Sequence, residues 1–300
     1  MNIHQTNRNL FGHLAPVHCL LLLHDNRIAS SSADSIIKIF NFSSSKCELS
    51  LQGHHSTVTF LTQLTSNLLI SCSHDKSIKV WSITSNSYQC EHTIEDAHSD
   101  VINKVIQLSY NRIASCSWDH HIKIWKSDTY ELIQDFEGHS DNINSIIQLE
   151  NKEILISLSS GFDKTMKIWN LVTYQCITAI QGIDCWSRHS LLQLSEDMII
   201  IGGTEIITLF NVNQLKTIKT FKIEKINYVY SIIPIDTNTI ICGCDCGRLV
   251  IINLTSGEID IKCSQNKQNI YSLMKYDNKH FLCCFFAGEL YFRSVNLKAL

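Results

Sequence analysis

The stretch S-C-S-W-D-H-H-I-K-I-W, residues 115–125, decides the fold because the chain repeats it. Small residues lead into a turn at Asp119, and an alternating apolar and polar strand then ends at Trp125. The other copies are S-C-S-H-D-K-S-I-K-V-W (71–81), S-S-S-A-D-S-I-I-K-I-F (30–40) and the longer S-L-S-S-G-F-D-K-T-M-K-I-W (157–169). In the first copy Phe40 replaces the final Trp. One structural unit is therefore written several times.

The spacing of the histidines gives the length of this unit. His13, His54, His98 and His139 follow one another at intervals of 41, 44 and 41 residues. A period of roughly 40–45 residues is typical of a propeller blade of four strands. The His-to-Asp distance is 21 residues in the first three units and 24 in the fourth, and six residues separate Asp from the aromatic in all four. Alternating segments and tight turns fill each unit, which favours strands over helices.

The second half of the chain keeps this rhythm but loses the marker residues. Thr204 stands at the Asp position of the fifth unit, and Asp245 lies one residue out of register in the sixth. The seventh unit has Ala287 at the Asp position and Arg293 at the Trp position. The later units are therefore recognised by strand pattern alone.

Seven units leave the last one short by a strand, whereas residues 3–10 supply a strand that precedes the first unit. Pairing these two ends would close a ring and remove exposed sheet edges. We therefore predict an all-β fold in which residues 1–300 form a single closed seven-bladed β-propeller with four antiparallel strands per blade. Well-marked repeats cover about 11–170, degenerate repeats cover about 171–300, and the N-terminal strand 3–10 completes the last blade.

These marker residues resemble the WD40 repeat family. The residues that carry the resemblance are Gly12-His13, Gly53-His54, Ala97-His98, Gly138-His139, Asp34, Asp75, Asp119, Asp163, Trp81, Trp125 and Trp169. The W-D dipeptide that names the family is W-S, W-K or W-N in this chain.

The resemblance implies a buried hydrogen-bond network of four side chains in each well-marked blade. Carried over residue by residue, the networks are His54, Ser71, Asp75 and Trp81; His98, Ser115, Asp119 and Trp125; and His139, Ser159, Asp163 and Trp169. A buried carboxylate needs hydrogen-bond donors, which imidazole, hydroxyl groups and turn amides can supply. We expect these residues to be structural.

Ser, His and Asp together also suggest a hydrolase triad, but a catalytic site is not repeated in every blade. The chain has no G-x-S-x-G elbow, phosphate-binding loop or H-E-x-x-H motif. Cys242, Cys244 and Cys246 would share one strand face and could hold a soft metal. Free Cys more often packs as a small hydrophobic residue. We predict no enzymatic activity, no cofactor and no metal.

The composition narrows the partners and the compartment. A net charge of −3 and a pI near 6.5 give no basic surface for nucleic acid. The 13 cysteines are scattered instead of framing a small secreted domain, and no apolar run is long enough for a membrane span. We expect an intracellular protein, cytoplasmic or also nuclear. Its oligomeric state stays open.

Side chains that the repeat leaves free are the better candidates for binding. They lie in the turn before the Asp and at the start of the innermost strand, around the mouth of the central channel. The candidates are His74, Trp118, Phe162, Trp186, Arg188, His189, Tyr228, Tyr230 and Tyr271. Trp, Tyr and Arg are enriched at interface hot spots, and propellers that resemble this one bind peptides at this rim. The alternative is that these aromatic side chains pack against neighbouring blades.

The leading functional hypothesis is a non-catalytic scaffold or adaptor that binds peptide segments or domains of other proteins at the rim. It would act by holding partners close together. A substrate receptor of a ubiquitin ligase is one alternative, although none of the three signature Trp residues begins the W-D-x-R pattern of that class. A phosphoinositide-binding propeller is another, although the chain lacks the paired-arginine F-R-R-G motif.

Overall fold

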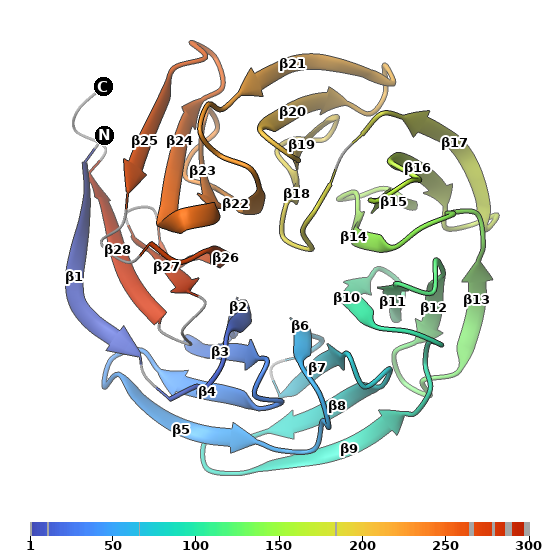
Figure 1. The fold of residues 1–300 in the computed structure, drawn as a ribbon. Coiled ribbons are helices and arrows are strands. Elements are labelled where there is room, and N and C mark those ends of the chain that lie inside the picture. The colour runs from blue at the N-terminus through green and yellow to red at the C-terminus, as the bar shows by residue number, and fades with distance from the viewer. Residues whose placement is uncertain are drawn as a thin grey trace.

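The structure is an all-β propeller in which four-stranded antiparallel sheets surround a central axis (Figure 1). The computed structural model describes residues 2–10, 12–65, 67–183, 185–263, 267–277, 280–285 and 290–296, with backbone positions only for 2–10 and 291–296. The predicted propeller of four-stranded blades is confirmed. Ala287 and the side chain of Arg293, which the sequence places in the last repeat, lie outside the described part.

Blades are numbered here from one to seven in the chain order of their innermost strands. The innermost strands are β2 (Val17–Leu22), β6 (Val58–Gln63), β10 (Ile102–Leu108), β14 (Ile143–Gln148), β18 (Leu191–Gln193), β22 (Val229–Pro234) and β26 (Ile270–Lys275). The second strands are β3 (Arg27–Ser32), β7 (Leu68–Ser73), β11 (Arg112–Ser117), β15 (Ile154–Ser159), β19 (Met198–Gly202), β23 (Thr239–Cys244) and β27 (His280–Phe285).

The outer half of each blade follows the same order. The third strands are β4 (Ile37–Asn41), β8 (Ile78–Ile83), β12 (Ile122–Lys126), β16 (Thr165–Asn170), β20 (Ile206–Asn211), β24 (Arg248–Asn253) and β28 (Leu290–Asn296). The outermost strands are β5 (Lys46–Leu51), β9 (Tyr88–Ile94), β13 (Leu132–Phe136), β17 (Gln175–Gln181), β21 (Lys216–Lys222), β25 (Ile259–Cys263) and β1 (Asn2–Leu10). A short 3-10 turn, η1 (Asp245–Gly247), connects β23 to β24.

Six sheets consist of four consecutive strands, and one sheet combines the two ends of the chain. Its order is β26, β27, β28 and β1, and β1 pairs antiparallel with β28. Figure 1 shows the blue N-terminal strand alongside the red C-terminal strand.

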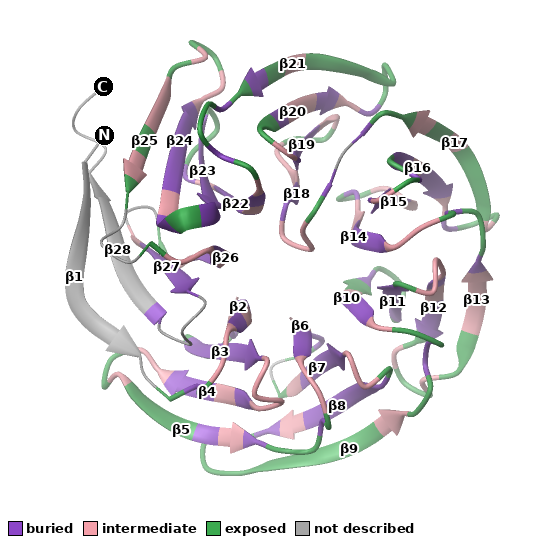
Figure 2. Cartoon of the chain, in the orientation of Figure 1, coloured by how far each residue is buried: buried purple, intermediate pink, exposed green. Residues whose placement is uncertain are grey.

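In blades one to six, burial is greatest in the second strands and least in the outermost strands (Figure 2). Every residue of β11 is buried, whereas most of β9 is exposed. The second strands are buried on both faces between neighbouring blades, where Ile70 and Ile113, for example, share one hydrophobic cluster. A fully buried Ile side chain contributes about 2 kcal/mol. Blade-to-blade packing is therefore the main source of stability.

A β-bulge near the start of the innermost strand recurs around the ring. The pairing register of β10 with β11, for instance, shifts between Ile102 and Lys104, so that Asn103 has no partner in the ladder. The corresponding unpaired residues in the other bulged strands are His18, Thr59, Asn144, Tyr230 and Tyr271. A bulge redirects a side chain, and this one positions a set of residues around the central axis.

Blade five departs from this pattern. Its innermost strand, β18, has three residues where the others have six or seven. An irregular segment precedes β18, and in it His189 makes a parallel bridge to Ser231 of blade six. The neighbouring Arg188 thereby reaches the channel, where it lines a cavity.

Candidate binding site at the channel mouth

Three blades contain a complete network of His, Ser, Asp and Trp side chains. In blade three, His98 Nδ1 lies 2.9 Å from Asp119 Oδ2 and His98 Nε2 lies 2.8 Å from Ser115 Oγ. Trp125 Nε1 donates to the same Ser115 Oγ at 2.9 Å. Blade two has the same arrangement, with distances of 2.7–2.8 Å among its four predicted side chains, His54, Ser71, Asp75 and Trp81.

The donors and acceptors of this network fix the state of the histidine. Indole N–H can only donate, so Ser115 Oγ accepts from Trp125 and its own proton points to His98 Nε2. The Nδ1–H of a neutral His98 then donates to Asp119. Burial lowers the pKa of His98 against the opposing effect of Asp119. Burial alone would raise the pKa of Asp119, but the hydrogen bonds that it accepts from His98 and from the backbone amides of His121 and Ser99 outweigh burial and hold that pKa below its ordinary value.

Blade four requires a correction. The hydroxyl between His139 and Trp169 belongs to Ser157, at 2.7 and 2.8 Å, and the prediction of Ser159 is wrong. Asp163 completes the network at 2.9 Å from His139 Nδ1. Of the three extra residues between His139 and Asp163, two lie after β15, in the turn to β16, so counting back from Asp163 reaches a serine too close to the turn. Ser159 Oγ instead donates to backbone carbonyls at the start of β14.

Blades one and six hold reduced versions of the network. His13 lies 2.8 Å from Asp34 and 2.7 Å from Ser30, but Phe40 offers no indole N–H. In blade six the buried Asp245 accepts from the backbone and side-chain amides of Asn227 at 3.2 and 3.0 Å. Sequence reasoning did not find Asn227, because the His position of that repeat carries no histidine.

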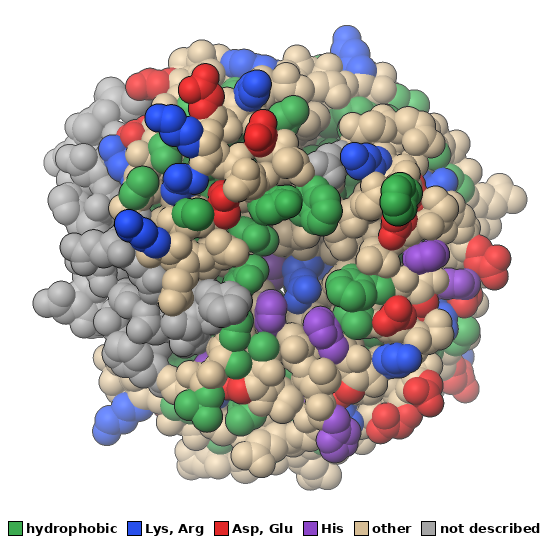
Figure 3. All heavy atoms as spheres, in the orientation of Figure 1, with side chains coloured by type: hydrophobic (Ala, Val, Ile, Leu, Met, Phe, Trp, Pro, Cys, Tyr) green, Lys and Arg blue, Asp and Glu red, His purple; other side chains and the backbone are tan. Residues whose placement is uncertain are grey.

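The central channel opens into a cavity of about 170 Å³ on the side of the ring that carries the turn after β11. The residues that line it are His18, Asn103, Trp118, Asn144, Trp186, Ser187, Arg188, His189, Tyr230 and Tyr271. Figure 3 shows basic side chains at the centre of the ring opening, with histidine and hydrophobic side chains around them. We call this region the channel mouth.

Aromatic rings form a continuous series along one side of the channel mouth. Trp186 lies 5.4 Å from Tyr228, Tyr228 lies 6.2 Å from Tyr230, and Tyr230 lies 5.0 Å from Tyr271 in an edge-on contact. Tyr271 in turn lies 5.4 Å from His18. We call these five residues the aromatic arc. Ring pairs at these distances fix one another's orientation, so the arc presents a pre-ordered apolar surface.

The opposite side carries Trp118, whose ring lies 6.0 Å from that of His74. Trp118 and Trp186 remain 37% and 46% exposed, although burial of indole is strongly favourable. Phe162 is fully exposed and does not line the cavity. The structure therefore brings together most of the predicted rim residues, while Phe162 lies apart and His74 and Tyr228 support the lining from behind.

The polar bulge residues of blades two to four have a structural role instead. Thr59 Oγ1 donates to the carbonyl of Ile102 at 2.6 Å, and Asn103 Nδ2 donates to the carbonyl of Ile143 at 2.9 Å. Asn144 Nδ2 donates to the carbonyl of Cys185 at 2.8 Å. Each of these side chains joins its blade to the next one.

Among the described residues, two cations at the channel have only neutral hydrogen-bond partners. Arg188 donates to the carbonyl of Thr59 at 3.1 Å and approaches Asn103 Oδ1 at 3.5 Å. Lys104 is buried; its Nζ donates to Ser145 Oγ at 3.1 Å and lies 5.1 Å from the ring centroid of Phe60. Burial lowers the pKa of Lys104 to about 8. Sequence reasoning missed Lys104; its signal is a Lys at a position where other repeats carry Ser, Cys or Phe.

Burial and the charges of nearby cations lower the pKa values of the two histidines at the channel mouth, His18 and His189. Burial, aided by the charge of Arg188, lowers the pKa of His18 to about 3. Burial likewise places the pKa of His189 well below its ordinary value, and its Nε2 donates to the carbonyl of His18 at 2.8 Å. Both imidazoles are neutral at pH 7, so the positive charge of the site comes from Arg188 and Lys104.

The cysteines do not converge on a metal site. Cys242 and Cys244 are buried in β23, whereas Cys246 is exposed in η1 with a φ of 53°. The alternation expected for all three therefore ends at Cys244. The described residues contain no group of three or more His, Cys, Asp or Glu side chains that could hold a metal ion.

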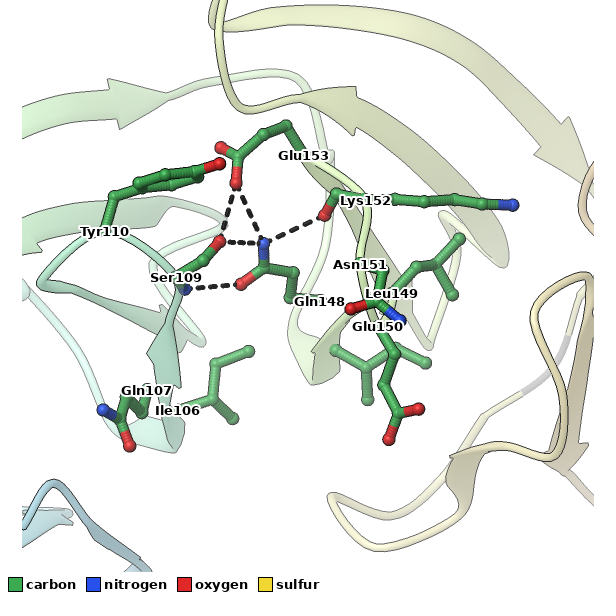
Figure 4. Close-up of a pocket in the computed structure, with 11 residues that line it drawn as sticks. Ile106, Gln107, Ser109, Tyr110, Gln148, Leu149, Glu150, Asn151, Lys152 and Glu153 are labelled. Atoms are coloured by element: carbon green, nitrogen blue, oxygen red, sulfur yellow. Dashed lines mark hydrogen bonds between the residues drawn. The ribbon is translucent and has the colours of Figure 1, made fainter.

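A larger hollow of about 640 Å³ lies at the other end of β11, between blades three and four (Figure 4). Its polar atoms satisfy one another: Gln148 Nε2 donates to Ser109 Oγ at 2.6 Å, and Ser109 Oγ donates to Glu153 at 2.6 Å. Glu153 also pairs with Arg112. Because Glu153 pairs with Arg112 and Lys152 pairs with Asp197 within the chain, this hollow is the weaker candidate for a ligand.

Comparison with known proteins agrees with the repeat pattern. The family model described as "WD domain, G-beta repeat" matches residues 4–41, 45–82, 88–126 and 130–170, which together exceed half of the chain. The WD repeat-containing protein 89 homolog of Dictyostelium discoideum is 32% identical over 126 residues, which is 41% of this chain and 33% of that relative. Within the described residues, no helix is long and apolar enough to cross a membrane. The chain belongs to the WD40 repeat family.

Proposed function

We propose that this propeller is a non-catalytic scaffold or adaptor that binds segments or domains of other proteins at the channel mouth. The observation that carries the proposal is the pair of half-exposed indoles, Trp118 and Trp186, on either side of a cavity that the aromatic arc lines. Large aromatic side chains that remain accessible around a small cavity are typical anchors of protein interfaces. WD40 propellers generally act as protein-interaction scaffolds, and a net charge of −3 favours a protein partner over nucleic acid.

The repeated Ser, His and Asp side chains support a structural role over a catalytic one. In blade three the connectivity is that of a hydrolase triad, with His98 between Asp119 and Ser115. Ser115 is fully buried, however, and its oxygen already accepts from Trp125. A nucleophile needs access to its substrate, which this serine lacks.

A closed seven-bladed ring, formed as one domain by residues 1–300, would give this site a rigid frame. Contacts between the last and the first blade support closure. Leu20 N donates to Ser272 Oγ at 3.3 Å, and Cys284 Sγ approaches the carbonyl of Val17 at 3.2 Å. Met274 and Leu290 also share a hydrophobic cluster with residues of blade one. The pairing of β1 with β28 would then act as the clasp that joins the two ends.

An intracellular, reducing location fits the cysteines of the chain, none of which forms a disulfide. Exposed cysteines such as Cys47, Cys90 and Cys176 would be open to oxidation elsewhere. The roles of ubiquitin-ligase receptor and phosphoinositide-binding propeller stay as alternative predictions.

The test compares the partners of the wild type with those of Trp118→Ala by proximity labelling and mass spectrometry in cells. We expect Trp118→Ala to lose partners while its melting temperature stays nearly unchanged, because the indole is partly exposed. Tyr110→Ala is the matched control, since Tyr110 is a 79% exposed aromatic at the opposite end of β11. An unchanged partner set, or a large loss of stability, would refute the proposal for this residue.

A further inference from the structure

Among the described residues, the buried cations and the partly buried Arg188 fall into two groups. Arg27 pairs with Asp25 at 2.7 Å, Arg112 pairs with Glu153, and Lys79 lies 3.9 Å from Glu95. Arg188 and Lys104 differ: within the part of the chain that the structure describes, neither has a carboxylate at ion-pairing distance. Removing a cation from water without an anionic partner is costly, so this exception needs an explanation.

Hydrogen bonding does not account for Arg188. A guanidinium group has five N–H donors, and those of Arg188 meet the carbonyl of Thr59 and, at the long distance of 3.5 Å, the amide oxygen of Asn103. Both acceptors are neutral. The guanidinium lines the cavity of the channel mouth, so donors remain for a ligand that enters from the open side.

The walls of the cavity strengthen the field of this charge. Trp118, Trp186, Tyr230 and Tyr271 line it, and no Asp or Glu is among the described lining residues. A charge beside low-dielectric walls attracts an opposite charge more strongly than it would in water. The volume of about 170 Å³ is well below that of a typical cofactor pocket. It suits a single side chain.

We infer that the channel mouth binds an acidic peptide segment of a partner, whose Asp or Glu carboxylate enters the cavity and pairs with the Arg188 guanidinium. Apolar residues beside that carboxylate would pack on Trp118 and Trp186. This inference rests on the proposed function and names the chemistry of the partner. A carboxylate is favoured over a phosphate because one guanidinium lines the cavity, whereas phosphate-recognition sites typically use clusters of Arg.

Lys104 is buried and does not line the cavity, but its positive charge adds to the electrostatic potential there. The Lys104 ammonium group and the Arg188 guanidinium group both lower the pKa of His189. Since His18 and His189 are neutral at pH 7, the positive charge near an entering carboxylate comes from Arg188, which lines the cavity, and from the buried Lys104, which does not.

The first test uses side-chain probes that need no knowledge of the partner sequence. N-acetyl glutamate α-amide and its glutamine isostere are titrated into the full chain and followed by NMR and by tryptophan fluorescence. We expect the glutamate probe to bind at least tenfold more tightly than the glutamine probe, with a preference that weakens as salt rises. Equal binding of the two probes, or tighter binding of phosphoserine α-amide than of the glutamate probe, overturns the carboxylate assignment.

Variants then place the binding at Arg188. Arg188→Met should remove the preference for glutamate and leave the melting temperature equal or higher, because it removes a cation without an anionic partner. Arg188→Lys, which keeps the charge, should retain part of the preference and serves if the Met variant does not fold. Arg248→Met, a surface change away from the cavity, should bind like the wild type. Retained preference in both Arg188 variants overturns the inference.

Asp184 is the carboxylate nearest to Arg188 in sequence and lies outside the described residues. If Arg188 is open to a carboxylate of a partner, Asp184→Asn should bind the glutamate probe like the wild type. A gain of tenfold or more would mean that the chain supplies its own carboxylate, and the inference would fail.

A final arm separates this inference from the proposed function. A random heptapeptide phage library is selected on the wild type and counter-selected on Arg188→Met. Enrichment of Asp or Glu beside apolar residues supports the inference. If acidic residues are not enriched while Trp118→Ala still loses its cellular partners, the carboxylate inference fails and the scaffold function stands. If Trp118→Ala keeps all partners, the scaffold function itself fails.

Discussion

In blades two to four, a charged and buried His–Ser–Asp–Trp network joins the loop before the innermost strand to the second and third strands. In blade five, Thr204 stands at the Asp position, and its blade is held mainly by apolar packing of residues such as Ile200, Ile207 and Phe221. Hydrophobic packing is non-directional and tolerates substitution. A network of four partners is directional, and losing one leaves the others unsatisfied. The same blade geometry is thus reached by two kinds of force.

The bulge residues at the channel mouth show a similar division between directional hydrogen bonds and apolar packing. The bulge residues Thr59, Asn103 and Asn144 of blades two to four form hydrogen bonds to the next blade. Those of blades six and seven, Tyr230 and Tyr271, pack against one another and face the cavity. Among the bulge residues, those of blades two to four therefore have a structural role, whereas those of blades six and seven can contact a ligand.

Acidification should have the largest effect on the free energy of unfolding, because it protonates histidines that are buried in the folded state. The pKa of His98 and that of His139, about 4, lie below the ordinary 6.5. A lowered histidine pKa gives stability that is complete above about pH 6.5 and is lost as pH falls toward the folded-state value. The loss from His139 alone is on the order of 3 kcal/mol. Below about pH 4, protonation of Asp75 and Asp119 adds to it, since their pKa values are also lowered.

Chemical denaturation between pH 7.5 and pH 4 measures this prediction. The free energy of unfolding should fall with pH. Protonation of His18 and His189 at the channel mouth adds to this fall, because their pKa values are lowered too. A free energy of unfolding that stays constant between pH 7.5 and pH 4 would show that these buried histidines do not control acid stability.

Removing one carboxylate should have the next largest effect. Asp119→Ala leaves the buried His98 Nδ1 and two turn amides without their acceptor. The expected cost is about 3 kcal/mol. Thr204→Ala, the matched change in blade five, should cost less than about 1 kcal/mol. Urea unfolding of both variants measures the difference, and equal costs would mean that the network contributes no more than packing does.

The sequence predicts the architecture well because the marker residues recur at a fixed period, and a period is a property of the chain alone. It fails where the period changes. In blade four the three extra residues between His139 and Asp163 could lie before or after the serine of the network, and sequence spacing alone does not decide between Ser157 and Ser159. The structure decides, because Ser157 lies opposite Lys167 in the β15–β16 ladder, as Ser115 lies opposite Lys123 in blade three.

The candidate site shows the same limit. The rim position of Arg188 follows from the rhythm of the repeats, but its lack of a carboxylate partner depends on which side chains converge from other blades. Lys104 was missed for this reason, since its neighbour Ser145 belongs to the next blade. Strand periodicity predicts position; it does not predict which charges are compensated.

A serine pair in blade four should give a smaller but sharper difference. Ser157→Ala leaves both His139 Nε2 and Trp169 Nε1 without a partner, at an expected cost of about 2 kcal/mol. Ser159→Ala removes donation to backbone carbonyls that lie near the surface, at about 1 kcal/mol or less. Thermal and urea unfolding compare the two. A larger cost for Ser159→Ala would restore the original assignment.

The smallest expected effect has the opposite sign. Ser31 of blade one is fully buried, and its hydroxyl is the one buried side-chain polar atom without a hydrogen-bond partner among the described residues. The equivalent positions of blades two and three are Cys72 and Cys116, which are also buried. Because an unsatisfied hydroxyl is costly to bury, Ser31→Cys should raise the free energy of unfolding by up to about 1 kcal/mol. Ser30→Cys, one residue earlier, is the control that should destabilise, since Ser30 Oγ lies 2.7 Å from His13 Nε2. If Ser31→Cys also destabilises, the hydroxyl has a partner that blade one needs, and blade one then relies on polar contacts as fully as the blades with a complete network.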